Sequence, residues 1–135
     1  MSNRRRARPW PAPAWWCSAL AQAARDAAER AYPNECCGLV YTSPSAGECP
    51  RLHVLRGHMT PTRCDADARD VIDFAYALAA QGGQVVATFH SHPTGQAGFS
   101  LRDEQLDAWA GVHLVLVWRA DGWQEQWYAT RLCAT

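Results

Sequence analysis

The sequence predicts a single α/β domain in which a mixed β-sheet is flanked by helices. Three observations support this prediction. The chain has 135 residues, the size of one domain. Hydrophobic residues make up 48% and charged residues 19%, as in a folded globular protein rather than a disordered one. Helical and extended patterns follow one another in the order α-β-β-α-β-α-β-β, which favours strands packed between helices.

Each predicted element depends on a local pattern. Helices are indicated by apolar residues at helical spacing, by an N-cap such as Asp65, and by stops such as Pro33 and the pair Gly82–Gly83. Strands are indicated by β-branched or alternating apolar runs with turn residues at both ends. Residues 58–64 are expected to be irregular. The predicted helices span 15–31, 65–81 and 100–110, and the predicted strands span 36–42, 51–57, 84–92, 112–118 and 123–130.

Charge and cysteine content exclude several classes of protein. Thirteen basic and thirteen acidic residues cancel, so the net charge favours neither a nucleic-acid nor a membrane partner. Residues 1–14 are predicted to be a basic, disordered arm whose prolines argue against a secretory leader, and residues 15–135 to be the domain. The six cysteines form no CxxC pair, which favours a reducing, cytoplasmic setting. Cys36 and Cys37 are expected to be small buried residues, with reactive thiols as the alternative.

The stretch HSHPTGQAGFSLRD, residues 90–103, carries four polar side chains at the two ends of a Pro/Gly loop. His90 and His92 end a predicted strand, where positions i and i+2 face the same side. Ser100 and Asp103 begin a predicted helix and share one of its faces. Two imidazoles and a carboxylate are a ligand set for a catalytic zinc. The alternative is structural: ordinary strand-end histidines and a capping box at the helix start.

A hydrolytic zinc centre also needs a general base that is not itself a ligand. Glu35 is the best upstream carboxylate, because it directly precedes an apolar strand, where an unpartnered charge is costly to bury. The alternative for Glu35 is a loop acid exposed to water. The remaining histidines are interpreted as a surface residue (His53), a residue that could line the cleft (His58) and a structural residue (His113).

Taken together, these residues resemble the JAMM/MPN-plus (JAB) family of zinc metalloproteases, in its stand-alone prokaryotic type. The resemblance covers about residues 19–129, and a composite motif of this length is highly specific. The family motif is a glutamate, then His-x-His-Pro, and then Ser-x-x-Asp, with seven residues between the second histidine and the serine. Its positions correspond here to Glu35, His90, His92, Pro93, Ser100 and Asp103.

The resemblance implies a JAB/MPN-like, cytidine-deaminase-like α/β fold and one Zn²⁺ per chain. By resemblance, His90, His92 and Asp103 are the metal ligands. Glu35 is the base that takes a proton from the attacking water and passes it to the leaving amine. Ser100 hydrogen-bonds the oxyanion of the tetrahedral intermediate. These three kinds of role agree with the chemistry of zinc hydrolases.

The resemblance further implies a peptidase or isopeptidase that acts after the C-terminal Gly-Gly of a small ubiquitin-like, sulfur-carrier protein. The chain is too compact for the insertions of family members that act in large complexes. Two alternatives stay open: a non-catalytic MPN-type scaffold and a general zinc peptidase. A metal-stabilised module of DNA-repair type lacks a basic, aromatic-interleaved surface in this sequence. Homodimer formation also stays open.

Overall fold

The computed structural model describes residues 7–44, 49–99 and 109–130. Within these ranges the chain folds into a mixed sheet and two helices. The helices are α1 (Ser18–Ala31) and α2 (Ala68–Ala80), and the strands are β1 (Arg8–Pro9), β2 (Cys37–Thr42), β3 (Arg51–Val54), β4 (Gly57–Thr60), β5 (Arg63–Ala66), β6 (Gln84–His92), β7 (Val112–Arg119) and β8 (Gly122–Ala129).

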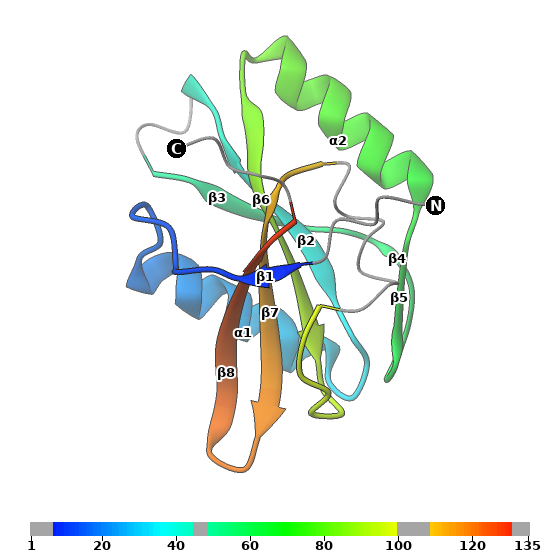
Figure 1. Ribbon diagram of the computed structural model, residues 1–135. Helices are drawn as coiled ribbons and strands as arrows, with labels where there is room; N and C mark the ends of the chain where they lie inside the picture. Colours follow the sequence, from blue (N-terminus) through cyan, green and yellow to red (C-terminus); the bar gives the residue numbers. More distant parts are fainter. Residues whose placement is uncertain (1–6, 45–48, 100–108, 131–135) are drawn as a thin grey trace, which may run out of the picture.

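Six strands form the main sheet in the order β1-β8-β7-β6-β2-β3, and β4 pairs with β5 in a separate two-stranded sheet. Strands β6 and β7 run parallel, whereas the other neighbours are antiparallel. Helices α1 and α2 pack on opposite faces of the main sheet (Figure 1). The predicted α/β architecture, a mixed sheet flanked by helices, is confirmed.

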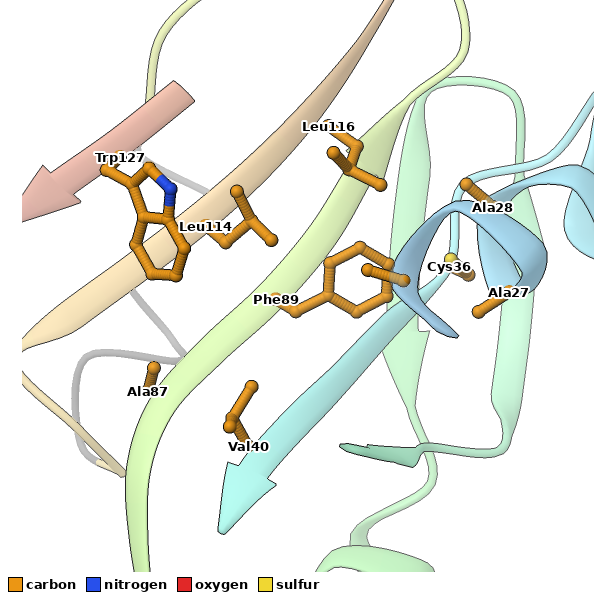
Figure 2. Packing of buried hydrophobic residues seen from close by; sticks show 10 residues of the cluster. Ala27, Ala28, Cys36, Val40, Ala87, Phe89, Leu114, Leu116 and Trp127 are labelled. Atoms are coloured by element: carbon orange, nitrogen blue, oxygen red, sulfur yellow. The ribbon is translucent and has the colours of Figure 1, made fainter. Parts of the chain in front are cut away.

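Helix α1 packs on one face of the sheet through small side chains. Ala24, Ala27 and Ala28 are buried in this contact and let the helix approach the strands closely. Phe89 of β6 and Leu114 of β7 lie opposite them, both fully buried (Figure 2). Burying one such side chain stabilises the fold by about 1.5–3 kcal/mol. This core holds β6 and β7 side by side beneath the residues at their ends.

Helix α2 covers the other face at the beginning of β6. Its residues Val71 and Phe74 pack with Leu39 of β2. Phe74 also meets Tyr41 edge-on, with ring centroids 5.1 Å apart. Tyr41 is the ladder partner of Val85, near the start of β6. Helix α2 therefore stabilises the start of β6, while the histidines lie at the opposite end of this strand.

The prediction that residues 58–64 are irregular is wrong, because β4 and β5 form an antiparallel hairpin there. The predicted N-cap is also wrong. Asp65 lies in β5 and pairs with Arg63 at 2.8 Å, whereas Asp67 caps α2 by accepting a hydrogen bond from the N–H of Arg69 at 2.9 Å. Both strands of the hairpin are polar and mostly exposed or half-buried, so they lack the apolar alternation that indicates a strand.

Two other predicted segments extend beyond the described residues. Of the predicted basic arm at 1–14, residues 1–6 lie outside them, and Arg8–Pro9 pairs with β8 as strand β1. Of the predicted helix at 100–110, residues 100–108 lie outside them. Neither of the described helices is long and apolar enough to cross a membrane.

Candidate functional site

The end of β6 brings two histidine side chains to one point. His90 and His92 are 1% and 4% exposed, so both imidazoles are buried. Their Nε2 atoms lie 3.0 Å apart, and their ring centroids 4.7 Å. Because alternate residues of a strand face the same side, the i, i+2 spacing alone produces this convergence. The two rings thus present one pair of nitrogens to a shared point, as the spacing predicts.

The loop that follows β6 determines which nitrogen of His92 carries the proton. The Nδ1 atom of His92 lies 2.6 Å from the backbone carbonyl oxygen of Gln96. A carbonyl oxygen can only accept, so the proton of a neutral His92 ring is on Nδ1. Nε2 is then the basic nitrogen, and it is the atom that lies next to His90. This tautomer is the one needed for a metal ligand that binds through Nε2.

Backbone pairing brings Glu35 to the same end of β6. The N–H of Ser91 donates to the carbonyl of Cys36 at 2.9 Å, and the hydroxyl of Ser91 accepts from the N–H of Cys36 at 2.9 Å. These bonds extend the ladder in which Cys37 stands opposite His90. Glu35 is the next residue along this ladder, so its backbone lies beside the end of β6.

Glu35 itself is buried, with 7% of its surface exposed, so the alternative of a water-exposed loop acid is wrong. Its N–H donates to the carbonyl of Thr60 at 2.8 Å, which ties it to the end of β4. Burial is the main cause that raises the pKa of Cys36 to about 12, and the negative charge of Glu35 adds to the increase. The carboxylate therefore lies within electrostatic reach of this thiol.

Two of the thiols near Glu35, those of Cys36 and Cys64, are disfavoured as thiolates. Cys36 and Cys37 are both buried, as expected for small apolar side chains. A hydrogen bond with Cys37, together with burial, raises the pKa of Cys64 far above its ordinary range. Because the thiolate is the nucleophilic form, these shifts suppress reactivity at Cys36 and Cys64. The carboxylate and the imidazoles are left as the groups suited to acid–base chemistry.

The other histidines do not join this pair. His113 is fully buried and structural, as expected: its Nδ1 lies 2.6 Å from the hydroxyl of Thr88 and its Nε2 2.8 Å from that of Thr130. His53 is half-buried on β3, and His58 is exposed on β4. The expectation of a structural His113 is therefore confirmed, whereas a role for His58 at the site stays a prediction.

Two residues with a role at the site were not singled out from the sequence. Ser91 has a usable signal, since it lies between two histidines of a buried strand and must face the opposite side. Phe99 has none. Its ring centroid lies 5.8 Å from that of His90 and 4.4 Å from that of His113, a contact that only the folded loop produces.

Two of the predicted site residues, Ser100 and Asp103, lie outside the described residues. In the ranges that the structure describes, no three His, Cys, Asp or Glu side chains gather into a group that could hold a metal ion. The described part of the chain therefore contributes the two histidines and the nearby glutamate. Two imidazoles on one strand are a normal part of a metal centre but an incomplete one.

The fold and the site together define a mixed α/β domain with a buried polar centre at the end of a central strand. The chain belongs to the prokaryotic homologues of the JAB domain, because the model of this family matches residues 18–130. The match includes both described helices and every candidate site residue. Membership is compatible with a hydrolase and with a scaffold that has no activity.

A solved structure agrees with this assignment of the fold. The chain is similar to the solution structure of protein DSY2949 from Desulfitobacterium hafniense, with 23% sequence identity and a TM-score of 0.57. The alignment covers 80% of this chain and 86% of that chain. At this identity the likeness shows the fold alone. None of the curated proteins matches this sequence.

Proposed function

We propose that the chain is a zinc-dependent peptidase or isopeptidase. Its substrate would be the peptide or isopeptide bond after the C-terminal Gly-Gly of a small ubiquitin-like, sulfur-carrier protein. The observation that supports this proposal most directly is the 3.0 Å separation between the Nε2 atoms of two buried histidines, His90 and His92. Glu35 directly precedes Cys36, whose backbone bonds Ser91 of β6, and it would supply the carboxylate that hydrolysis requires.

The spacing of the two nitrogens fits a shared zinc ion. Zinc–imidazole bonds are about 2.0–2.1 Å long, so two nitrogen ligands of a tetrahedral zinc lie about 3.3–3.4 Å apart. The nitrogens of His90 and His92 are a few tenths of an ångström closer than this. A small rotation of either ring would therefore admit the metal. Asp103 would be the third protein ligand, which makes one Zn²⁺ per chain.

When bound, zinc would supply Lewis acidity and make water nucleophilic near neutral pH. The chain would supply the proton transfers. Glu35 would accept a proton from the attacking water and deliver it to the leaving amine, a role commonly worth about 10²–10⁴-fold in rate. Ser100 would donate a hydrogen bond to the oxyanion, commonly worth about 3 kcal/mol. The burial of Glu35 would keep competing solvent away from the carboxylate.

The surroundings of the site support an extended tail as the substrate. Among the described strands, β5 pairs with β4 alone, so its other edge could pair with a bound peptide. Backbone pairing demands little sequence, whereas passage over a metal beside a narrow loop favours residues without a Cβ. Gly-Gly meets this requirement. The five cysteines in the described part of the chain are free thiols, which supports a reducing compartment such as the cytoplasm.

The proposal is tested with carrier proteins that have a C-terminal extension after Gly-Gly. Zinc-loaded protein is expected to release the extension, as followed by intact mass, and Glu35→Gln is expected to release little. The same carriers with Ala-Ala in place of Gly-Gly should be cut much more slowly. Similar rates for both would instead favour a general zinc peptidase. Zinc binding without cleavage of any carrier or unfolded peptide would favour a non-catalytic scaffold.

A further inference from the structure

The loop that fixes the His92 tautomer is exposed in its middle, although Pro93 at its start is buried. Thr94, Gln96 and Ala97 are exposed. Within the loop, the N–H of Gly95 donates to the carbonyl of His92 at 3.2 Å and closes a tight turn. Exposed loops with few buried contacts are the segments that open most easily. Side chains from outside the loop that bond its backbone therefore help the carbonyl of Gln96 to keep its direction.

The first such side chain is Arg119, at the end of β7. Its guanidinium donates to the carbonyl of Gly95 at 2.8 Å, and its Nε donates to the side-chain oxygen of Gln124 at 3.4 Å. A Cβ placed on Gly95 would lie 3.3 Å from the carbonyl oxygen of Trp118, so the loop passes close to the end of β7. A hydrogen bond from a charged donor is among the stronger ones in proteins.

The second side chain is Gln126 on β8. Its Oε1 accepts from the N–H of Gly98 at 3.3 Å and from the hydroxyl of Tyr128 at 2.9 Å. The tyrosine bond orients the carboxamide so that its oxygen faces the loop. Phe99, the next residue, packs against Tyr128 with ring centroids 6.2 Å apart. Arg119 and Gln126 therefore hold the backbone on the two sides of Gln96.

We infer that Arg119 and Gln126 are positioning residues that keep the Gln96 carbonyl against His92 and thereby set the affinity for zinc. This inference rests on the proposed function. A histidine that binds a metal usually donates its other N–H to a carbonyl or carboxylate, and loss of such support weakens metal binding about 10–100-fold. If either anchor is lost, the carbonyl of Gln96 turns away. The proton of His92 can then move to Nε2, the nitrogen that the metal requires.

The test compares variants that remove each anchor with variants that keep its hydrogen bond. Arg119→Gln and Gln126→Leu remove the bonds to the loop. Arg119→Lys keeps a cationic donor, and Gln126→Glu keeps an oxygen that accepts both bonds. Arg69→Gln is the matched control, since Arg69 is an exposed residue of α2 whose described partner is Asp73, an i, i+4 ion pair.

Two measurements are made on every variant. Zinc affinity is obtained by competition with a chelator. The His92 tautomer is obtained on metal-free protein from long-range proton–nitrogen spectra of nitrogen-labelled histidine, at about pH 8, where free imidazole is neutral. Arg119→Gln and Gln126→Leu are each expected to bind zinc about 10-fold more weakly and to show a mixture of tautomers. The conservative variants and the Arg69 control should stay within about threefold of wild type, with Nδ1 protonated.

Wild-type affinity together with an unchanged tautomer in Arg119→Gln and Gln126→Leu would overturn the inference. The inference would also be overturned if the conservative variants lost as much zinc affinity as Arg119→Gln and Gln126→Leu and if this loss followed a lower thermal midpoint of the metal-free protein. Such a result would indicate general destabilisation. If wild-type protein binds no zinc, the proposed function fails. In that case the tautomer of the metal-free protein still decides whether the two anchors orient His92.

Discussion

The backbone N–H of Cys36 donates to the hydroxyl of Ser91 at 2.9 Å, and the N–H of Ser91 donates to the carbonyl of Cys36 at 2.9 Å. Ser91 lies between the two site histidines but faces the other side of β6. Cys36 directly follows Glu35. This pair of bonds therefore sets the position of the candidate base relative to the imidazoles, across 55 residues of sequence.

Ser91→Ala is expected to lower the free energy of unfolding by about 1–3 kcal/mol, because it leaves a buried N–H without its acceptor. Ser91 is fully buried, so water cannot easily replace the hydroxyl. Urea unfolding followed by circular dichroism measures the change. Thr94→Ala in the exposed loop is the control and should stay within about 0.5 kcal/mol. A loss in Ser91→Ala no larger than in this control would contradict the role of the bond.

Glu35→Gln is expected to keep the fold and the bound zinc but to lose about 10²–10⁴-fold in turnover, since an amide cannot accept the proton of water. Turnover, metal content and circular dichroism are compared on the same preparations. Asp26→Asn, on the exposed side of α1, is the charge-matched control and should keep wild-type activity. Wild-type turnover in Glu35→Gln would remove Glu35 from the mechanism.

His90→Ala and His92→Ala are each expected to reduce bound zinc from about one per chain to near zero, because two protein ligands hold this metal poorly. Elemental analysis after gel filtration measures the content, and circular dichroism verifies folding. His58→Ala, exposed on β4, should retain the metal. Retention of stoichiometric zinc by either His90→Ala or His92→Ala would show that the ligand assignment is wrong.

The free energy of unfolding is expected to fall at alkaline pH because of the Cys36 thiol. Burial raises the pKa of this thiol from 9.0 to about 12 in the folded protein. Above about pH 9 the unfolded chain therefore loses a proton that the folded chain keeps, and stability falls by up to about 1.4 kcal/mol per pH unit. Below pH 9 the contribution is fully present.

Cys36→Ala isolates this effect. Urea unfolding in the presence of a reductant, at about pH 7, 9 and 10.5, should show a shallower decline for the variant than for wild type. The comparison of slopes is independent of any constant loss caused by the smaller side chain. Parallel declines in the two proteins would mean that the Cys36 thiol ionises as readily in the folded chain as in the unfolded one.

Local patterns were sufficient for most of the main sheet. The apolar strands around residues 37–42, 84–92 and 112–119 were predicted nearly to their ends, because strands buried in a core consist of β-branched and apolar runs. The hairpin at 57–66 was not, because its half-exposed polar strands do not show that pattern. For the same reason the cap of α2 was placed at Asp65, inside the hairpin.

The sequence by itself determined that His90 and His92 converge, because a strand places alternate residues on one face regardless of what surrounds it. It also determined the motif through which the family resemblance is visible. Only the tertiary structure decided that Glu35 lies at the end of β6 and that Arg119 and Gln126 hold the loop after it. These contacts depend on the register between strands distant in sequence, and that register is set by the packing of whole faces in the core rather than by any local preference.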